Sequence, residues 1–271
     1  MKLFINHFDK SEFEPLMEHL KDVDFSLFLD SPPKSQDELS NINIMVLQEP
    51  NEYFGYHKWV VENQEIFNVI LSWSDLVLNN CKQAIYLPFG GTWFKPDQYE
   101  KKHNKEFKVA HLRGKLLKTY GQSIRHEIYD RENEIIITPT KFFDVYGSRD
   151  IIEEARIGKE EVFGDCQYGV VIENTSHRGY FTEKILDCFL LKTIPIYWGC
   201  SNIGDFFNED GIIKFGNTDE FVYITNSLKD GDYGWKTNAI EENYQLALKY
   251  VNYPQNIVNK ITEIFKLNQI I

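Results

Sequence analysis

The chain has 271 residues, more than a typical single domain, and its 42% hydrophobic and 15% aromatic residues are enough to build buried cores. A net charge of -12 excludes a nucleic-acid-binding surface, which needs clustered Lys and Arg side chains. Because no stretch approaches the roughly 18 apolar residues of a membrane span and no signal-like segment opens the sequence, we expect a globular cytoplasmic protein with no integral membrane segment and no nucleic-acid partner.

Short apolar runs alternate with helical segments through the first part of the chain. A helix is expected near residues 13–20. Strands that alternate with helices are typical of a parallel α/β sheet. We therefore predict that residues 1–100 form an amino-terminal Rossmann-like domain. Its expected strands are residues 3–6, 25–29, 44–47, 69–72 and 85–87.

A polar, proline-bearing segment at residues 95–105 is the predicted linker between two domains. The second domain is expected to cover residues 101–271. Near its end, residues 239–250 and 257–265 have helical spacing on either side of Pro254 and predict two terminal helices.

The most informative stretch lies in this second domain. An apolar run ends at Ile172 in a polar, glycine-bearing loop, after which apolar positions recur at helical spacing. Thr182 is the predicted N-cap of this helix, with Glu183 and Lys184 in its first turn. Residues 193–199 form a second apolar run. The whole unit therefore predicts strand, loop, helix and strand, as in a right-handed parallel crossover.

This crossover predicts a ligand site. Parallel sheets bind ligands at the carboxyl ends of their strands, where a helix N-terminus offers backbone N–H groups and a positive partial charge of about half a unit. Lys184 lies at that N-terminus, where a lysine opposes the helix dipole unless an anion is also present. We therefore expect an anion such as a diphosphate to bind there.

A second helix is expected to begin at the same edge of the sheet. Residues 107–112 are a predicted strand and residues 122–129 a predicted helix, so Arg125 lies near the helix start. A guanidinium at this place can bind two phosphate oxygens at once. Arg113 and Lys115, at the exit of the strand, are alternative cations for the same role.

Three motifs, at residues 172–175, 179–184 and 194–199, together resemble the donor-binding signature of the α-1,3/1,4-fucosyltransferases of glycosyltransferase family 10. Residues 123–130 resemble the family's helix that carries a pyrophosphate-binding arginine. The resemblance implies the GT-B class of α/β fold, in which two Rossmann-like domains with parallel sheets face a central cleft. It also implies that the first domain binds the acceptor and that the last helix returns to it.

The resemblance further implies a function and residue roles. A member of this family is an inverting glycosyltransferase that moves L-fucose from GDP-fucose to a hydroxyl of a glycan acceptor. By position in the motifs, Asn174, Tyr180, Glu183 and Lys184 match the residues that contact the nucleotide sugar, and Arg125 matches the pyrophosphate-binding arginine.

Glu49 is the matching position for the catalytic base. The apolar run of residues 43–47 stops at Gln48, so Glu49 lies at the carboxyl end of a strand and is followed by Pro50. In the family, a glutamate in a similar strand-end motif accepts the proton of the acceptor hydroxyl. Glu52 is the alternative residue for this role. By itself, a loop glutamate in an acidic protein is usually ordinary surface.

The acceptor pocket is expected in first-domain loops at residues 49–56 and 89–94. Aromatic side chains in these loops can stack on sugar faces. The candidates are Tyr53, Phe54, Tyr56, Trp93 and Phe94.

No cofactor is expected to be obligatory besides the nucleotide-sugar donor, because Arg125 and Lys184 can neutralise the leaving diphosphate. The Asp-x-Asp pairs at residues 22–24 and 230–232 are weak metal candidates, and we predict no metal site. Two alternatives stay open: a transferase of the same fold with another donor, GDP-mannose or UDP-xylose, and a non-catalytic carbohydrate-binding protein. A dinucleotide-binding protein is disfavoured because no G-x-G-x-x-G motif follows the first strand.

Overall fold

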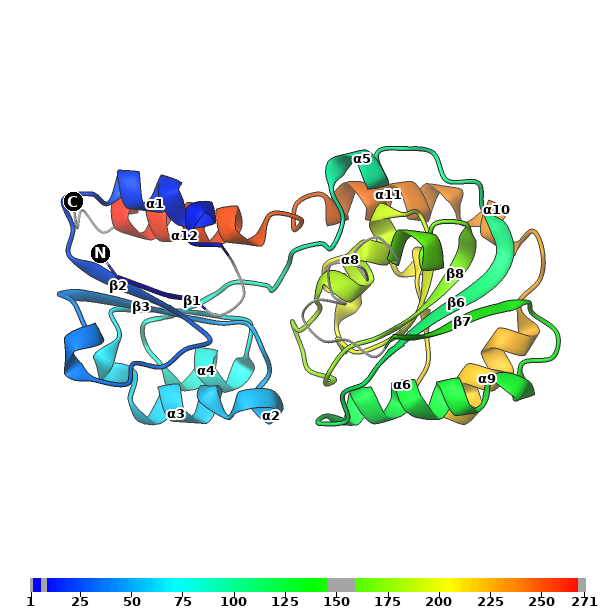
Figure 1. Cartoon of the computed structure of the whole chain (residues 1–271), viewed down its shortest axis with the longest axis horizontal. Helices are drawn as coiled ribbons and strands as arrows, with labels where there is room; N and C mark the ends of the chain where they lie inside the picture. Colours follow the sequence, from blue (N-terminus) through cyan, green and yellow to red (C-terminus); the bar gives the residue numbers. More distant parts are fainter. Residues whose placement is uncertain (1, 6–8, 146–158, 268–271) are drawn as a thin grey trace. The chain divides into compact units, whose positions relative to one another are not determined.

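The computed structural model describes residues 2–5, 9–145 and 159–267. Within it the chain divides into two compact units, each built on a five-stranded parallel sheet (Figure 1). The first unit contains the chain up to Phe89, the short segment Arg178–Tyr180 and the chain from Asn252 onward. The second unit contains Gly90–His177 and Phe181–Val251. The predicted α/β class with two Rossmann-like parallel sheets is confirmed.

The sheet of the first unit has its strands in sequence order, and every neighbouring pair is parallel. All residues of its second strand are buried, as expected for a parallel sheet covered on both faces. All five predicted strands are present, although Asn6 lies outside the described residues. The strands are β1 (Lys2–Ile5), β2 (Phe25–Leu29), β3 (Ile42–Leu47), β4 (Val69–Ser72) and β5 (Ala84–Tyr86).

Helices cover both faces of this sheet. One face packs against α1 (Glu14–His19) and α12 (Tyr253–Leu267), the last described helix of the chain (Figure 1). The other face packs against α3 (Tyr56–Glu62) and α4 (Asp75–Asn80), which follow the short helix α2 (Asn51–Phe54). The region from residue 49 to residue 56, expected to be a loop, therefore contains α2 and the start of α3, separated by Gly55.

The second unit repeats this three-layer plan. Its sheet has the order β10-β9-β8-β6-β7, with all pairs parallel. Helices α8 and α11 pack on one face, and α6 and α9 on the other (Figure 1). The strands are β6 (Glu106–Gly114), β7 (Thr140–Val145), β8 (Cys166–Ile172), β9 (Ile194–Trp198) and β10 (Ile213–Lys214). The helices are α5 (Pro96–Tyr99), α6 (Tyr120–Asp130), α8 (Glu183–Leu190), α9 (Thr218–Ser227), α10 (Asp232–Trp235) and α11 (Thr237–Ala247).

Within the described ranges, no helix combines the length and the apolar character that a membrane crossing requires.

Candidate functional site

The strand order of the second sheet creates a topological switch point. From β6, the chain goes to β7 on one side and then crosses to β8 on the other side, so the loops after β6 and β8 leave in opposite directions. In open α/β sheets, ligands bind outside the carboxyl ends of the strands at such a point.

The two central strands also separate at this place. β6 pairs with β8 only as far as Ala110 opposite Gly169, whereas it stays paired with β7 up to Gly114. β8 meanwhile continues beside β9 up to Ile172. The sheet therefore opens between β6 and β8 near its carboxyl edge.

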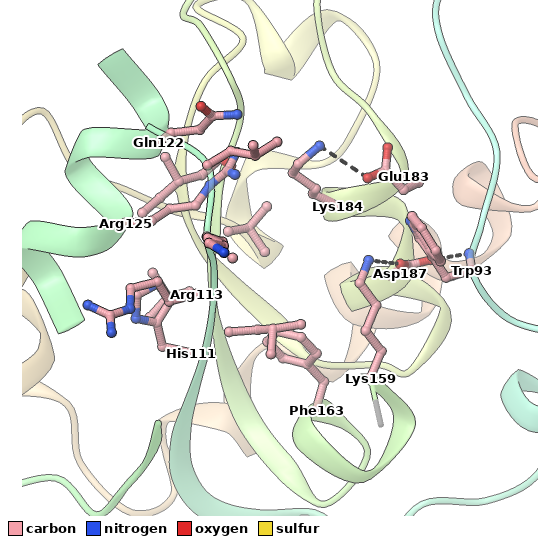
Figure 2. A pocket seen from close by; sticks show the side chains of 17 residues that line it. Trp93, His111, Arg113, Gln122, Arg125, Lys159, Phe163, Glu183, Lys184 and Asp187 are labelled. Carbon is pink, nitrogen blue, oxygen red and sulfur yellow. Dashed lines mark hydrogen bonds and ion pairs between the residues drawn. The ribbon is translucent and has the colours of Figure 1, made fainter. Parts of the chain in front are cut away.

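A cavity of about 300 Å³ lies at this opening, with all of its lining in the second unit. In Figure 2, Gln122 and Arg125 approach it from α6, and Glu183 and Lys184 approach it from the first turn of α8. Three of the predicted donor-binding residues, Arg125, Glu183 and Lys184, therefore line one cavity. Lys115 lines it too, from the loop after β6.

The first turn of α8 is held by a carboxylate that the sequence analysis did not assign. Thr182 is the N-cap, as predicted, and its hydroxyl accepts from the N–H of Lys184 at 3.3 Å. Glu173 is completely buried and accepts from the backbone N–H of Thr182 at 3.0 Å and from its hydroxyl at 2.7 Å. Glu173 thereby connects the end of β8 to the start of α8. Gly199 leaves room for it, since a Cβ there would lie 2.5 Å from the Cγ of Glu173.

Lys184 has two carboxylates near it. Its ammonium donates to Glu183 and to the Thr182 hydroxyl, each at 3.1 Å, and lies 3.9 Å from a Glu173 oxygen. Burial by itself would raise the pKa of Glu183, but the charges of Lys184 and Lys159, with hydrogen bonds from Lys184 and Trp93, lower this pKa to about 2. Burial raises the pKa of Glu173, and the charge of Lys184 opposes that shift. Lys184 and Glu183 therefore face the cavity as an ion pair.

Arg125 spans the opening between the strands. Its Nε and Nη2 donate to the carbonyl of Ile172 at 3.0 and 2.6 Å, and Nη2 also donates to Oδ1 of Asn174 at 3.0 Å. Arg125 thus satisfies the last carbonyl of β8 while it lines the cavity. Asn174 is 7% exposed and joins the site through this hydrogen bond. Of the alternative cations, Arg113 lies over the Tyr129 ring at 3.9 Å and pairs with Asp130.

A glycine permits this packing. The N–H of Gly121, in the first turn of α6, donates to the carbonyl of Asn174 at 3.1 Å. A Cβ at this position would lie 1.9 Å from the carbonyl oxygen of Glu173, a distance that the backbone cannot accommodate without moving. Only glycine therefore lets the α6 terminus, and with it Arg125, approach the end of β8 this closely.

Sequence reasoning missed one wall of the cavity. Asp187, 2% exposed on α8, accepts from Lys159 at 2.7 Å, from the Thr92 hydroxyl at 2.7 Å and from the backbone N–H of Trp93 at 3.1 Å. The Lys159 ammonium also lies 5.0 Å from the centroid of the Trp93 ring. The apolar spacing of α8 indicated a buried face, but no local pattern could reveal that Asp187 binds a segment more than 90 positions earlier.

Glu49 and Tyr180 belong to the first unit. Glu49 is half-buried after β3, as predicted, and its backbone N–H donates to Asp30 at 2.9 Å. Tyr180 is completely buried, with its ring 4.5 Å from that of Trp73. The catalytic role of Glu49 and donor binding by Tyr180 stay predictions.

The placement of Trp93 and Phe94 in the first domain is wrong, and their contact with an acceptor sugar stays a prediction. Both residues belong to the second unit, where Trp93 lines the cavity and Phe94, 6% exposed, packs in the hydrophobic core. The hydrogen bonds from Thr92 and Trp93 to Asp187 hold this segment against α8.

No group of three or more His, Cys, Asp or Glu side chains arranged to hold a metal ion occurs among the residues that the structure describes. The charged groups that line the cavity include the ion pairs and the Arg125 guanidinium described above, together with Arg113 and Lys115.

No protein-family model matches the chain. In sequence, it is 37% identical over 67 residues to the alpha-(1,3)-fucosyltransferase FucT of Helicobacter pylori, a match that covers 24% of this chain and 14% of that protein. It is 30% identical over 87 residues to an alpha-(1,4)-fucosyltransferase of Arabidopsis thaliana, which covers 29% of this chain and 22% of that protein. The matched segments span less than a quarter of either relative.

Solved structures are similar over most of the chain. A crystal structure of an alpha1,3-fucosyltransferase has a TM-score of 0.56 at 18% identity, covering 97% of this chain and 88% of that one. Anabaena Alr3699/HepE in complex with UDP and glucose has a TM-score of 0.54 at 13% identity, covering 83% of this chain and 71% of that one. The GT-B fold class and the resemblance to α-1,3/1,4-fucosyltransferases are confirmed by these similarities.

Proposed function

We propose that the protein is an inverting glycosyltransferase that moves L-fucose from GDP-fucose to a hydroxyl of a glycan acceptor. The observation that carries the proposal is the convergence of Arg125 and Lys184 on one cavity at the switch point of the second sheet. Similarity to fucosyltransferases supports the choice of donor. One of them is a crystal structure with GDP-fucose, whose comparison with this chain gives a TM-score of 0.52. The cytoplasm stays the predicted compartment.

The cavity suits a nucleoside diphosphate. Phosphate oxygens at the start of α8 would meet its backbone N–H groups and the positive end of its dipole. The ammonium of Lys184 would then exchange its present contacts with Glu183 and Thr182 for a phosphate oxygen. Glu183 would in turn accept hydrogen bonds from hydroxyl groups of the ribose or the sugar, and Asn174 would bind such hydroxyl groups as well.

The proposed transfer is a single displacement. Glu49 accepts the proton of the acceptor hydroxyl while the oxygen attacks the anomeric carbon, from the side opposite the leaving diphosphate. Inversion at that carbon follows from the single attack. Arg125, Lys184 and the α8 terminus stabilise the negative charge that develops on the leaving group. The proposal therefore includes no obligatory metal cofactor.

Donor identity is tested by thermal unfolding in the presence of GDP-fucose, GDP-mannose, UDP-xylose and UDP-glucose. A ligand at 100 times its Kd stabilises the folded protein by about 2.7 kcal/mol. We expect GDP-fucose to raise the Tm most and GDP-mannose less, with no response to the uridine donors. A selective response to a uridine donor would overturn the donor assignment, and no response to any nucleotide sugar would overturn the transferase proposal.

The catalytic role of Glu49 is tested with Glu49→Gln, and Glu52→Gln is the matched control. We expect Glu49→Gln to lower kcat by about 100-fold or more while the KM for the donor stays nearly unchanged, because the amide cannot accept the proton. Glu52→Gln should keep wild-type turnover. Equal turnover of Glu49→Gln and the wild-type enzyme would remove Glu49 from this role.

A further inference from the structure

A second cavity, of about 490 Å³, lies in the second unit away from the proposed donor site. Its inner wall includes Tyr168, which precedes Ile172 by four positions on β8, or about 13 Å along the strand. The donor cavity is lined by the carboxyl-terminal half of β8, whereas this one reaches the strand nearer its start. The two cavities share no lining residue.

An exposed tryptophan forms the rim of this cavity. Trp235, the last residue of α10, lines it and is 91% exposed. Tryptophan contributes a large apolar surface that folding normally covers, so its nearly complete exposure is informative. The backbone around it is held in place: the Tyr233 hydroxyl donates to the carbonyl of Lys192 at 2.7 Å, and the Lys236 ammonium donates to the carbonyl of Asp210 at 2.6 Å. The indole is therefore presented to solvent from an anchored segment.

The rest of the lining mixes polar side chains with the apolar Ile213, Leu228 and Ala239, and it includes one ammonium, that of Lys236. The carboxylate of Asp210 and the amide of Asn238 both line the cavity, and neither has a hydrogen-bond partner in the described part of the chain. Asp232 adds a second carboxylate. The ammonium of Lys236 is already bound to the Asp210 carbonyl. The two carboxylates outnumber the one ammonium, and this negative balance of charge disfavours phosphates and nucleotides, which need donors and positive charge.

A buried hydroxyl lies at the inner end. Tyr168 is completely buried, and its hydroxyl has no hydrogen-bond partner within the described residues. Burial raises the pKa of Tyr168 to about 12, with the charge of Asp232 acting in the same direction, so the hydroxyl keeps its proton. A buried polar group without a partner is uncommon in folded proteins. Tyr168 lines the cavity as a residue, and its hydroxyl is itself closed to solvent.

We propose that this cavity is a second carbohydrate-binding site, which takes one or two sugar residues of a neutral glycan. An aromatic face beside carboxylate and amide groups matches the two sides of a sugar ring, since the C–H face stacks on the indole and the hydroxyl groups donate to Asp210 and Asn238. Its volume is within the range of small-molecule sites. The site is separate from donor binding and goes beyond the proposed transferase activity.

Saturation-transfer difference NMR on the full chain tests the site. The probes are D-galactose, N-acetyl-D-glucosamine and N-acetyllactosamine at millimolar concentration, each with and without saturating GDP. We expect signal on the ring protons of at least one sugar, unchanged by GDP. Absence of signal for all three sugars, or its loss when GDP is added, would overturn the proposal.

Variants locate the site. Trp235→Ala should weaken sugar binding by about tenfold or more, and Asn238→Ala should weaken it severalfold. Tyr223→Ala is the matched control, because Tyr223 is an aromatic residue on α9 that is 74% exposed and does not line the cavity. Because both aromatic residues are exposed, both variants should fold, which circular dichroism checks. Wild-type binding by Trp235→Ala would overturn the assignment, whereas failure of GDP to bind would count only against the proposed transferase.

Discussion

Replacing Glu173 with glutamine tests how the α8 terminus is built. The change is nearly isosteric, but the carboxylate accepts at both oxygens, from the N–H of Thr182 at 3.0 Å and from its hydroxyl at 2.7 Å. Glutamine has one accepting oxygen and one donating amide. In either orientation its amide must face a donor, because the Thr182 hydroxyl already accepts from the N–H and the ammonium of Lys184.

The magnitude follows from burial. Glu173 is 0% exposed, so water cannot take the place of the lost acceptor. An unsatisfied buried donor costs about 1–3 kcal/mol, and we therefore expect Glu173→Gln to lower the free energy of unfolding by about 2 kcal/mol. In a unit of this size, that corresponds to a decrease in Tm of roughly 4–8 °C.

Urea denaturation measures the loss of stability, and isothermal titration calorimetry measures GDP affinity. GDP affinity should fall by about tenfold, because the first turn of α8, which carries Lys184, loses a hydrogen bond between Thr182 and residue 173 that holds it in place. Glu134→Gln is the matched control: Glu134 binds Arg131 at an exposed site, so its replacement should leave the free energy of unfolding nearly unchanged. If Glu173→Gln stays within about 0.5 kcal/mol of the wild type, the argument from donor and acceptor groups is refuted.

Three further changes test the site and its surroundings. Arg125→Lys cannot keep the forked contact with the carbonyl of Ile172, so calorimetry should show GDP affinity reduced by about tenfold. An unchanged Kd for GDP would contradict the proposed role of Arg125 in diphosphate binding. Asp187→Asn leaves the Lys159 ammonium without its carboxylate, so urea denaturation should show a free energy of unfolding lower by about 1–3 kcal/mol. An unchanged free energy of unfolding would show that this ion pair does not stabilise the fold. Burial raises the pKa of Asp30 to about 8, so the folded protein holds this proton between about pH 4 and pH 8, where the unfolded chain has lost it. The wild type should therefore lose stability relative to Asp30→Asn as pH rises through this window, by at most about 1.4 kcal/mol per pH unit, and parallel pH profiles would refute the shift.

Local patterns in the sequence predicted the five strands of the first sheet, the strands β6, β8 and β9 of the second, and the α8 cap, but not β7, β10 or the helices α3, α4 and α9. The apolar run before Ile172, the N-cap Thr182 and the second apolar run all appear in the structure as predicted. Each depends on neighbouring residues, whose spacing is written directly in the chain. The resemblance to a known family then pointed to Arg125, Glu183 and Lys184, which the structure places around one cavity.

Only the tertiary structure decided what lies beside these residues. The buried role of Glu173 requires the end of β8 to meet the start of α8, and the role of Asp187 requires Thr92 to pack on α8. The burial of Tyr180 against Trp73 likewise joins positions far apart in the chain. Such contacts link residues that are distant in sequence, so no spacing or periodicity records them. They arise when the sheet brings its strand ends together, and that arrangement decides which polar side chains are buried and which face the cavity.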